Sequence, residues 1–151
     1  MNYYNGYSGS ERDAKLKAQH ARVSRGCPSH PQGPCAICGD RQVELEAHDE
    51  DYSQPYKWEP PAQYAVCHRC HMRLHNRFRN PEVWEAHKEH VRQGGRANED
   101  AKFNVVRNAI RGRDFSTLAL SSPTRVMGHL WWEALSTDPK TLHDPAARPR
   151  P

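Results

Sequence analysis

Four of the five cysteines fall into two pairs of identical spacing, Cys35 with Cys38 and Cys67 with Cys70. Two such pairs supply the four thiolates that a structural Zn²⁺ takes in a tetrahedron, and Gly39 permits a tight turn after the first pair. Four unrelated buried thiols would not repeat this spacing. A redox pair is an alternative, but neither pair lies at the strand-to-helix turn of an α/β pattern. We therefore predict a structural zinc site.

The fifth cysteine, Cys27, forms a second candidate ligand pair with His30, although we expect an ordinary free thiol there. Paired cysteines favour thiolate ligands in a reducing compartment over disulfides, so we expect a cytoplasmic protein. The N-terminal residues have neither the basic start nor the apolar stretch of a signal peptide. No apolar run approaches the ~18–20 residues that span a bilayer, and we expect no membrane contact.

Metal-capable side chains gather beside the two cysteine pairs. His48 and Asp49 stand where a predicted strand ends, and His71 and His75 follow Cys70 with i, i+4 spacing. On a helix this spacing places both imidazoles on one face, one turn apart, where they can share an ion. The pattern indicates a second metal site, or a catalytic one, near the zinc.

The elements that would position these residues are short. Alternation predicts a strand over 43–48, and a second strand over 64–66 leads into Cys67. Helical patterns follow at 68–78, at 82–93 after an Asn-Pro start, and at 10–24, 99–111 and 122–135. Hydrophobic residues make up 36% of the chain, so the core is thin and a metal would help to hold it. We predict an α+β fold, a small zinc-stapled centre with flanking α-helices.

The expected organisation has four parts; residues 1–10 are expected to be disordered or to dock late, and the tail from residue 138 is expected to be unstructured. Trp84 is expected in the core, His87 and His90 at the surface, and one of Trp131 and Trp132 at an interface, because adjacent helical residues cannot both face one core. The parts are a polar N-terminal segment and helix at 1–26, a zinc-bound core at 27–95, a helical extension at 96–137 and a Pro-rich tail at 138–151.

The combination of these motifs resembles the HNH endonuclease family, whose ββα-metal fold is treble-clef-like. The resemblance covers about residues 35–79 and rests on the two cysteine pairs, the segment Glu-Ala-His-Asp-Glu-Asp-Tyr-Ser-Gln-Pro at 46–55, and the His71/His75 pair. It implies that zinc ties two knuckles together and that a hairpin runs into a helix. It also implies hydrolysis of a phosphodiester with one divalent ion, usually Mg²⁺, and a histidine that takes a proton from water.

Carried over by position, His71 and His75 would hold the catalytic ion. His48 would be a further ligand and Asp49 would stand at the base position, where the family usually has histidine. Aspartate, with a reference pKa near ~3.9, is a poor base at neutral pH, and a shifted register with His48 as base and Asp49 as ligand is favoured on chemical grounds. The Asn of the motif is replaced by Ala62, and the neighbouring Gln63 is a candidate substitute.

The stretch from His68 to Arg113 holds eleven Lys and Arg against five Asp and Glu. Such a field attracts a polyanion, although basic runs are often only a solvated helical face. The expected partner is double-stranded DNA, and the candidate contact residues are Arg69, Arg73, Arg77 and Gln63. Cutting both strands would require a homodimer.

We therefore expect a metal-dependent HNH endonuclease of restriction, homing or phage type, or a nickase. The alternative is a non-catalytic zinc-binding module that docks nucleic acid or protein and retains a decayed site. A redox or disulfide protein is a third class, and tight zinc retention would argue against it.

Overall fold

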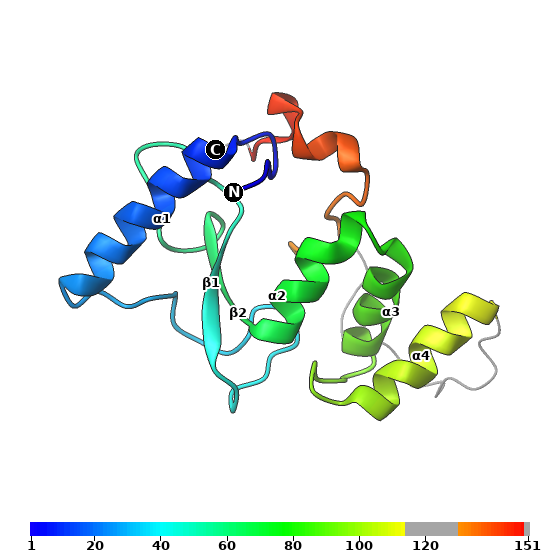
Figure 1. Ribbon diagram of the computed structural model, residues 1–151. Helices are drawn as coiled ribbons and strands as arrows, with labels where there is room; N and C mark the ends of the chain where they lie inside the picture. The colour runs from blue at the N-terminus through cyan, green and yellow to red at the C-terminus, as the bar shows by residue number, and fades with distance from the viewer. Residues whose placement is uncertain (114–129, 150–151) are drawn as a thin grey trace. The chain divides into compact units, whose positions relative to one another are not determined.

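The computed structural model describes residues 1–113 and 130–149. It combines helices with one two-stranded sheet, which confirms the α+β class (Figure 1). None of its helices, within these ranges, has both the length and the apolar character needed to cross a bilayer. The elements are α1 (Gly9–Ser24), β1 (Leu45–Asp49), β2 (Gln63–Cys67), α2 (His68–His75), η1 (Asn76–Phe78), α3 (Pro81–Arg92), α4 (Asp100–Gly112), η2 (Pro139–Leu142) and η3 (Pro145–Ala147).

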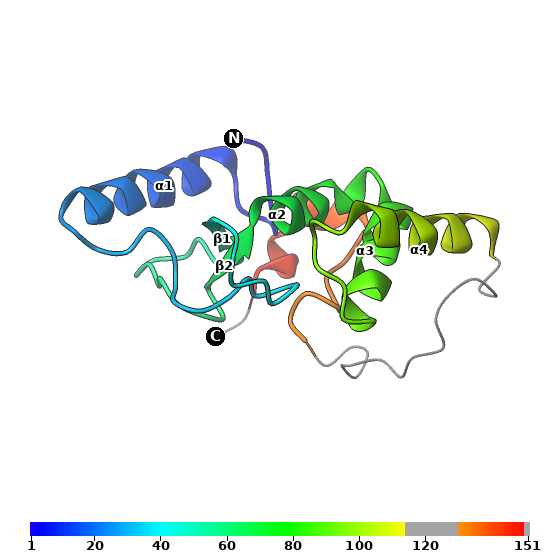
Figure 2. The same cartoon turned by 90° about the horizontal axis from the view of Figure 1, so that it is seen from below.

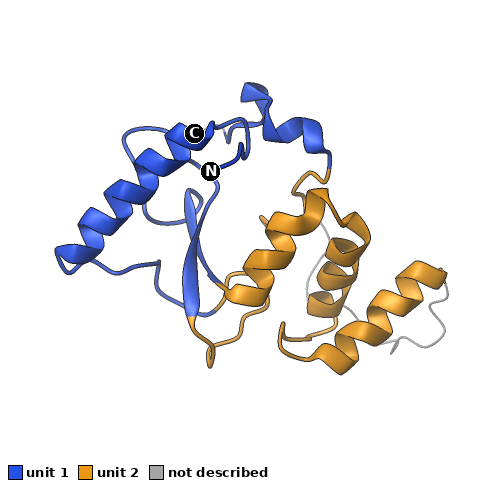
Figure 3. Cartoon of the chain, in the orientation of Figure 1, with its two compact units in different colours: residues 1–34, 45–66, 138–151 blue, residues 35–44, 67–137 orange. Residues whose placement is uncertain are grey.

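Two compact units make up the chain, and each draws on segments distant in the sequence (Figure 3). The first contains residues 1–34, 45–66 and 138–151, with α1, β1 and most of β2. The second contains residues 35–44 and 67–137, with both cysteine pairs and α2 to α4. The cysteine knuckle at 35–44 is thus grouped with helices that follow it by more than twenty residues.

Helix α1 begins at Gly9, one residue before the predicted start. Ser8 is its N-cap and forms a capping box with Glu11. The buried side chains of α1 are polar, Lys15 and Gln19, whereas its apolar Leu16 is exposed. The helix therefore packs through hydrogen bonds and an ion pair rather than through an apolar stripe.

Strands β1 and β2 form an antiparallel hairpin within the first unit, and they run side by side in Figures 1 and 2. The amide of Glu50, just after β1, donates to the carbonyl of Ala62, just before β2, at 3.0 Å. All five residues of β2 are buried. Both strands lie within two residues of the predicted positions, because period-two alternation and the flanking loop residues define them.

The two ends of the described chain are bound to each other, and the tail forms η2 and η3, so the expectation of an unstructured tail is wrong. Tyr4 and Tyr7 form an isolated bridge around a turn. Gly6 in that turn has φ +76°, and a Cβ there would lie 2.3 Å from the carbonyl oxygen of Asp144. The amide of Gly6 donates to the carbonyl of Leu142, and Arg148 donates to the carbonyl of Gly6. This close approach requires glycine.

The second unit has its core between α3 and α4, which lie side by side (Figure 2). Ala86, Phe103 and Val106 are buried there, and Val83 and Ile110 pack against them. Trp84 is fully buried, as predicted, and its ring makes an edge contact with Trp132 at 6.3 Å between centroids. The apolar spacing of both helices accounts for this packing.

The predicted helix at 122–135 falls mostly outside the described residues, and residues 131–134 form a turn rather than a helix. Of the two adjacent tryptophans, Trp132 is fully buried. Trp131 is partly exposed and donates its Nε1 hydrogen to the carbonyl of Ala36 at 3.3 Å. Trp131 therefore contacts the cysteine knuckle of its own unit.

Candidate metal centre and histidine sites

The four paired cysteines come together in the second unit. Their sulfur atoms all lie within 4.8 Å of one another, and each residue is buried. A tetrahedral zinc with Zn–S bonds of ~2.3 Å places its sulfurs about 3.8 Å apart. The cluster could therefore hold a zinc ion with small side-chain adjustments, and all five cysteines are free thiols.

The backbone of the first knuckle is built for this geometry. Gly39 has φ +75°, and its amide donates to the carbonyl of Cys35 at 2.8 Å, while the amide of Cys35 donates to the carbonyl of Asp40. Cys67 is the N-cap of α2, and its amide donates to the sulfur of Cys35 at 3.3 Å. A helix N-terminus favours negative charge, so the second pair lies where thiolates are stabilised.

The thiols perturb one another strongly. Hydrogen bonds from Cys38, and then from Cys67 and Cys70, lower the pKa of Cys35, whereas the hydrogen bond with Cys35 raises the pKa of Cys70. Four thiolates at this separation repel one another, so they can all be ionised only around a cation. The donor set fits Zn²⁺. Cys27, in the first unit, is not part of this cluster.

A buried histidine lies against the cysteine cluster. His87 Nε2 is 3.3 Å from the sulfur of Cys70, and Arg73 lies 3.0 Å from His87 Nδ1. Because a guanidinium only donates, Nδ1 accepts, and Nε2 carries the hydrogen that points at the sulfur. Burial, followed by the charge of Arg73, lowers the pKa of His87 to about 3, so the ring is a neutral donor at physiological pH.

Our expectation that His87 and His90 are surface residues is wrong. His87 is fully buried, and His90 is nearly so. His90 Nε2 lies 2.7 Å from the carbonyl oxygen of Arg96, whose own guanidinium donates to the carbonyl of Cys38. Both rings also pack edge-on against Phe103. The sequence pattern assigned these histidines to the surface because they are polar. In the fold, hydrogen bonds to specific partners satisfy both imidazoles.

The expected histidine pair forms on α2. His71 Nε2 and His75 Nε2 are 2.9 Å apart, and their ring centroids are separated by 4.7 Å. Both residues are partly buried. Two nitrogen ligands at about 2.1 Å from one ion in adjacent octahedral positions lie about 3.0 Å apart. The pair therefore has the spacing of two ligands of one divalent ion.

At the end of β1, His48 is held by a carboxylate. His48 Nε2 is 2.5 Å from Glu50 Oε1, and both side chains are buried. Glu50 also accepts from the hydroxyl of Tyr4 and from the amide of Asn5, each at 2.6 Å. A carboxylate surrounded by donors fixes the ring, and with the hydrogen on Nε2 the lone pair of a neutral imidazole lies on Nδ1.

Asp49 is engaged differently. Its Oδ1 lies 2.6 Å from the ammonium of Lys15 and 3.0 Å from the amide nitrogen of Gln63. Lys15 is fully buried, and Gln63 is buried and also donates to Gln19 at 3.2 Å. Lys15 and Gln63 thus hold the carboxylate of Asp49, whereas Glu50 holds the ring of His48.

The residues proposed to contact DNA lie in unequal surroundings. Arg69 is exposed and ion-paired with Asp100. Arg73 lies over the ring of Phe103, 3.7 Å from its centroid. Arg77 is 1% exposed and donates to the carbonyls of Leu74 and Ser136. Arg77 and Gln63 are both buried, which the sequence pattern did not indicate.

Several side chains around these sites were not singled out from the sequence. Tyr4 and Asn5 lie more than forty residues from the glutamate they bind, and no local pattern connects them. Lys15 gave only a weak signal, a cation on a helix with little apolar surface. His87 gave none, since its role arises from the packing of α3 in its own unit.

Comparison of the chain with protein-family models, with curated proteins and with solved structures gave no match.

Proposed function

We propose that the protein is a metal-dependent endonuclease of the HNH type that hydrolyses DNA phosphodiesters. One observation carries the proposal: His71 and His75, which directly follow a cysteine of the zinc-type cluster on α2, have ring nitrogens 2.9 Å apart. Ligand pairs with that spacing hold divalent ions, and the structural cluster beside them would fix the start of the helix.

His48 is the best candidate for the general base. Glu50 holds its Nε2, so His48 would take the proton of an attacking water on Nδ1. Asp49, whose carboxylate is paired with Lys15, is assigned to orientation of the strand end instead. The proposal requires His48 and the α2 histidine pair to act on the same phosphodiester.

The division of labour then follows from ordinary chemistry. A divalent ion, when bound by His71 and His75, stabilises the charge that develops on the phosphate and on the leaving oxygen. His48 takes the proton of the water. Glu50 holds the ring in one tautomer and stabilises the imidazolium that forms, as a carboxylate does for a catalytic histidine in other hydrolases.

The test is cleavage of supercoiled plasmid with Mg²⁺ or Mn²⁺. Nicking by the zinc-loaded protein is expected to require the added ion and to be lost in His71→Ala and His75→Ala. His20→Ala, which removes an exposed histidine of α1, is the matched control and should cut normally. Undiminished cutting by His71→Ala would remove the basis of the proposal.

A second candidate is a zinc module that binds DNA without cutting it. The ion pair between Lys15 and Asp49 favours it, because it neutralises the carboxylate that stands where the family has its base. Under this reading the protein binds duplex DNA but leaves plasmid intact with every divalent ion, and His48→Ala changes neither binding nor cutting.

A further inference from the structure

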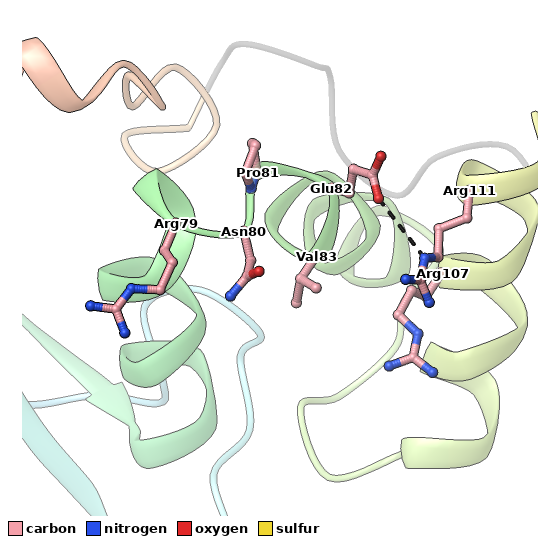
Figure 4. A pocket seen from close by; sticks show the side chains of 7 residues that line it. All are labelled: Arg79, Asn80, Pro81, Glu82, Val83, Arg107 and Arg111. Carbon is pink, nitrogen blue, oxygen red and sulfur yellow. Dashed lines mark ion pairs between the residues drawn. The ribbon is translucent and has the colours of Figure 1, made fainter.

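A pocket in the second unit lies where α3 begins, next to the last turns of α4 (Figure 4). Its volume is about 360 Å³, within the range of roughly 300–1,000 Å³ found for ligand pockets. Most of its lining residues are exposed, so it is open to solvent. The lining is Arg79, Asn80, Pro81, Glu82, Val83, Arg107 and Arg111.

The pocket has an excess of positive charge. Three arginines face one glutamate, and the Arg111–Glu82 pair has its atoms 3.9 Å apart with both side chains largely exposed. Such a pair is worth little in water and leaves both groups available to another ion. Arg79, from the turn before α3, also lines the pocket, and its guanidinium extends away from Arg107 and Arg111 (Figure 4).

Arg107 adds a donor that lacks an acceptor. Its Nε is shielded from solvent and has no hydrogen-bond partner among residues 1–113 and 130–149. Buried donors are nearly always satisfied, because a donor removed from water without a partner is costly. Arg107 also lines the pocket, where the outer nitrogens of its guanidinium would donate to a bound oxyanion.

The N-terminus of α3 also favours an anion in the pocket. Asn80 is the N-cap but makes no side-chain capping hydrogen bond, and Pro81 occupies the first turn. The helix ladder begins with the amide of Trp84, bonded to the carbonyl of Asn80. The amides of Glu82 and Val83 therefore precede the ladder at the positive end of the helix dipole, where phosphate groups bind.

We propose that this pocket binds a backbone phosphate of the DNA, with Arg107 and Arg111 as its main cationic donors and Arg79 at its rim. Guanidinium groups bind phosphate oxygens in pairs of parallel hydrogen bonds. Among residues 1–113 and 130–149, the lining has no aromatic side chain that could stack on a base, so these residues favour recognition of phosphate over sequence. The assignment rests on the proposed function, since it takes DNA as the partner.

The experiment measures binding of a short fluorescent duplex by anisotropy, across a series of salt concentrations and without added Mg²⁺. Arg107→Gln and Arg111→Gln are each expected to weaken binding about tenfold at low salt and to lower the slope of log K against log salt by about 0.9. Arg107→Lys, which keeps the charge and loses the fork, should fall between them and the wild type. Glu82→Gln should strengthen binding.

Lys102→Gln is the matched control, because Lys102 is an exposed cation of α4 outside the pocket. Zinc content and thermal unfolding of each variant show that the fold is kept. Equal affinity and equal salt slope for Arg107→Gln, Arg111→Gln and the wild type would overturn the proposal. So would binding of inorganic phosphate that Arg107→Gln abolishes while duplex binding is unchanged, because the pocket would then serve a free anion.

The two proposals fail separately. If the wild type and His71→Ala are equally unable to cut plasmid, the nuclease assignment fails, and the pocket still stands when Arg107→Gln weakens duplex binding. If His71→Ala alone abolishes cutting while the pocket variants bind DNA normally, the nuclease assignment stands and the pocket assignment fails.

Discussion

His48 Nε2 and Glu50 Oε1 lie 2.5 Å apart on consecutive same-face positions at the end of β1. The contact is a short, charge-assisted hydrogen bond; the hydroxyl of Tyr4 donates to the same Oε1, and the side-chain amide of Asn5 donates to Oε2. The imidazole is therefore oriented by a group whose own position is fixed from the N-terminal turn.

Replacing this carboxylate should impair catalysis more than folding. Glu50→Gln is expected to lower the rate of plasmid nicking about 10- to 100-fold, the range for loss of a group that orients a functional histidine. Single-turnover cleavage with saturating protein measures it. Glu59→Gln, an exposed glutamate of the intervening loop, is the control. Equal cleavage rates for Glu50→Gln and wild type would show that the contact has no catalytic role.

The N-terminal turn should contribute to the stability of its unit. Tyr4→Phe removes the hydroxyl that donates to Glu50, and hydrogen bonds to charged groups are worth about 1.5–3 kcal/mol. We expect the midpoint of urea unfolding to fall accordingly. Tyr3→Phe, at an exposed neighbouring position, serves as the reference. A Tyr4→Phe protein with an unchanged midpoint would contradict the prediction.

The cysteine cluster should hold one metal ion that the fold of the second unit needs. Cys70→Ser is expected to lose zinc and the cooperative unfolding of that unit, because binding energy at a structural zinc site is folding energy. Cys27→Ser, which changes the thiol outside the cluster, should keep full zinc content. Elemental analysis of the purified proteins decides the matter, and zinc content in Cys70→Ser equal to that of wild type would refute it.

The hydrogen bond to Cys70 should tighten metal binding. His87→Phe keeps the ring volume but removes the Nε2 hydrogen, and zinc affinity is expected to fall about 10- to 100-fold. Competition with a chromogenic chelator measures this affinity. His90→Gln alters a buried imidazole on the same helix that bonds a carbonyl of Arg96, and it should leave zinc affinity near the wild-type value.

Alkaline pH should destabilise the first unit. Burial, and then the hydrogen bond to Asp51, raise the pKa of Tyr7 to about 12 from its ordinary 10.0. A group with a raised folded-state pKa contributes stability below its unfolded pKa, and this contribution is lost as pH rises from about 10 through about 12. The difference between the urea midpoints at pH 8 and at pH 11 should therefore be smaller in Tyr7→Phe than in the wild type.

Sequence reasoning succeeded where the information is local. The Cys-x-x-Cys spacings, the Gly39 turn and the i, i+4 spacing of His71 and His75 depend only on neighbours along the chain, and the structure brings each of these sets together. The strands and α2 to α4 also lie within a few residues of their expected bounds.

The failures involve partners far away in sequence. Tyr4 bonds Glu50, Lys15 bonds Asp49, and Arg77 bonds the carbonyl of Ser136, and each pairing spans more than thirty residues. The sequence pattern alone assigns a polar side chain to the surface, because burying it costs free energy unless it forms a hydrogen bond, and here the partner is distant in sequence. The ordered ends have the same origin, since contacts such as Gly6 with Leu142 and Arg148 with Gly6 join segments far apart in the sequence.

That clasp between the termini bears on biosynthesis. Residues 138–149 leave the ribosome long after His48, yet Leu142 and Arg148 secure the turn from which Tyr4 and Asn5 reach Glu50. In a nascent chain, His48 is consequently synthesised before Leu142 and Arg148. The contacts that support this turn from the C-terminal side can therefore form only once residues 138–149 have been synthesised.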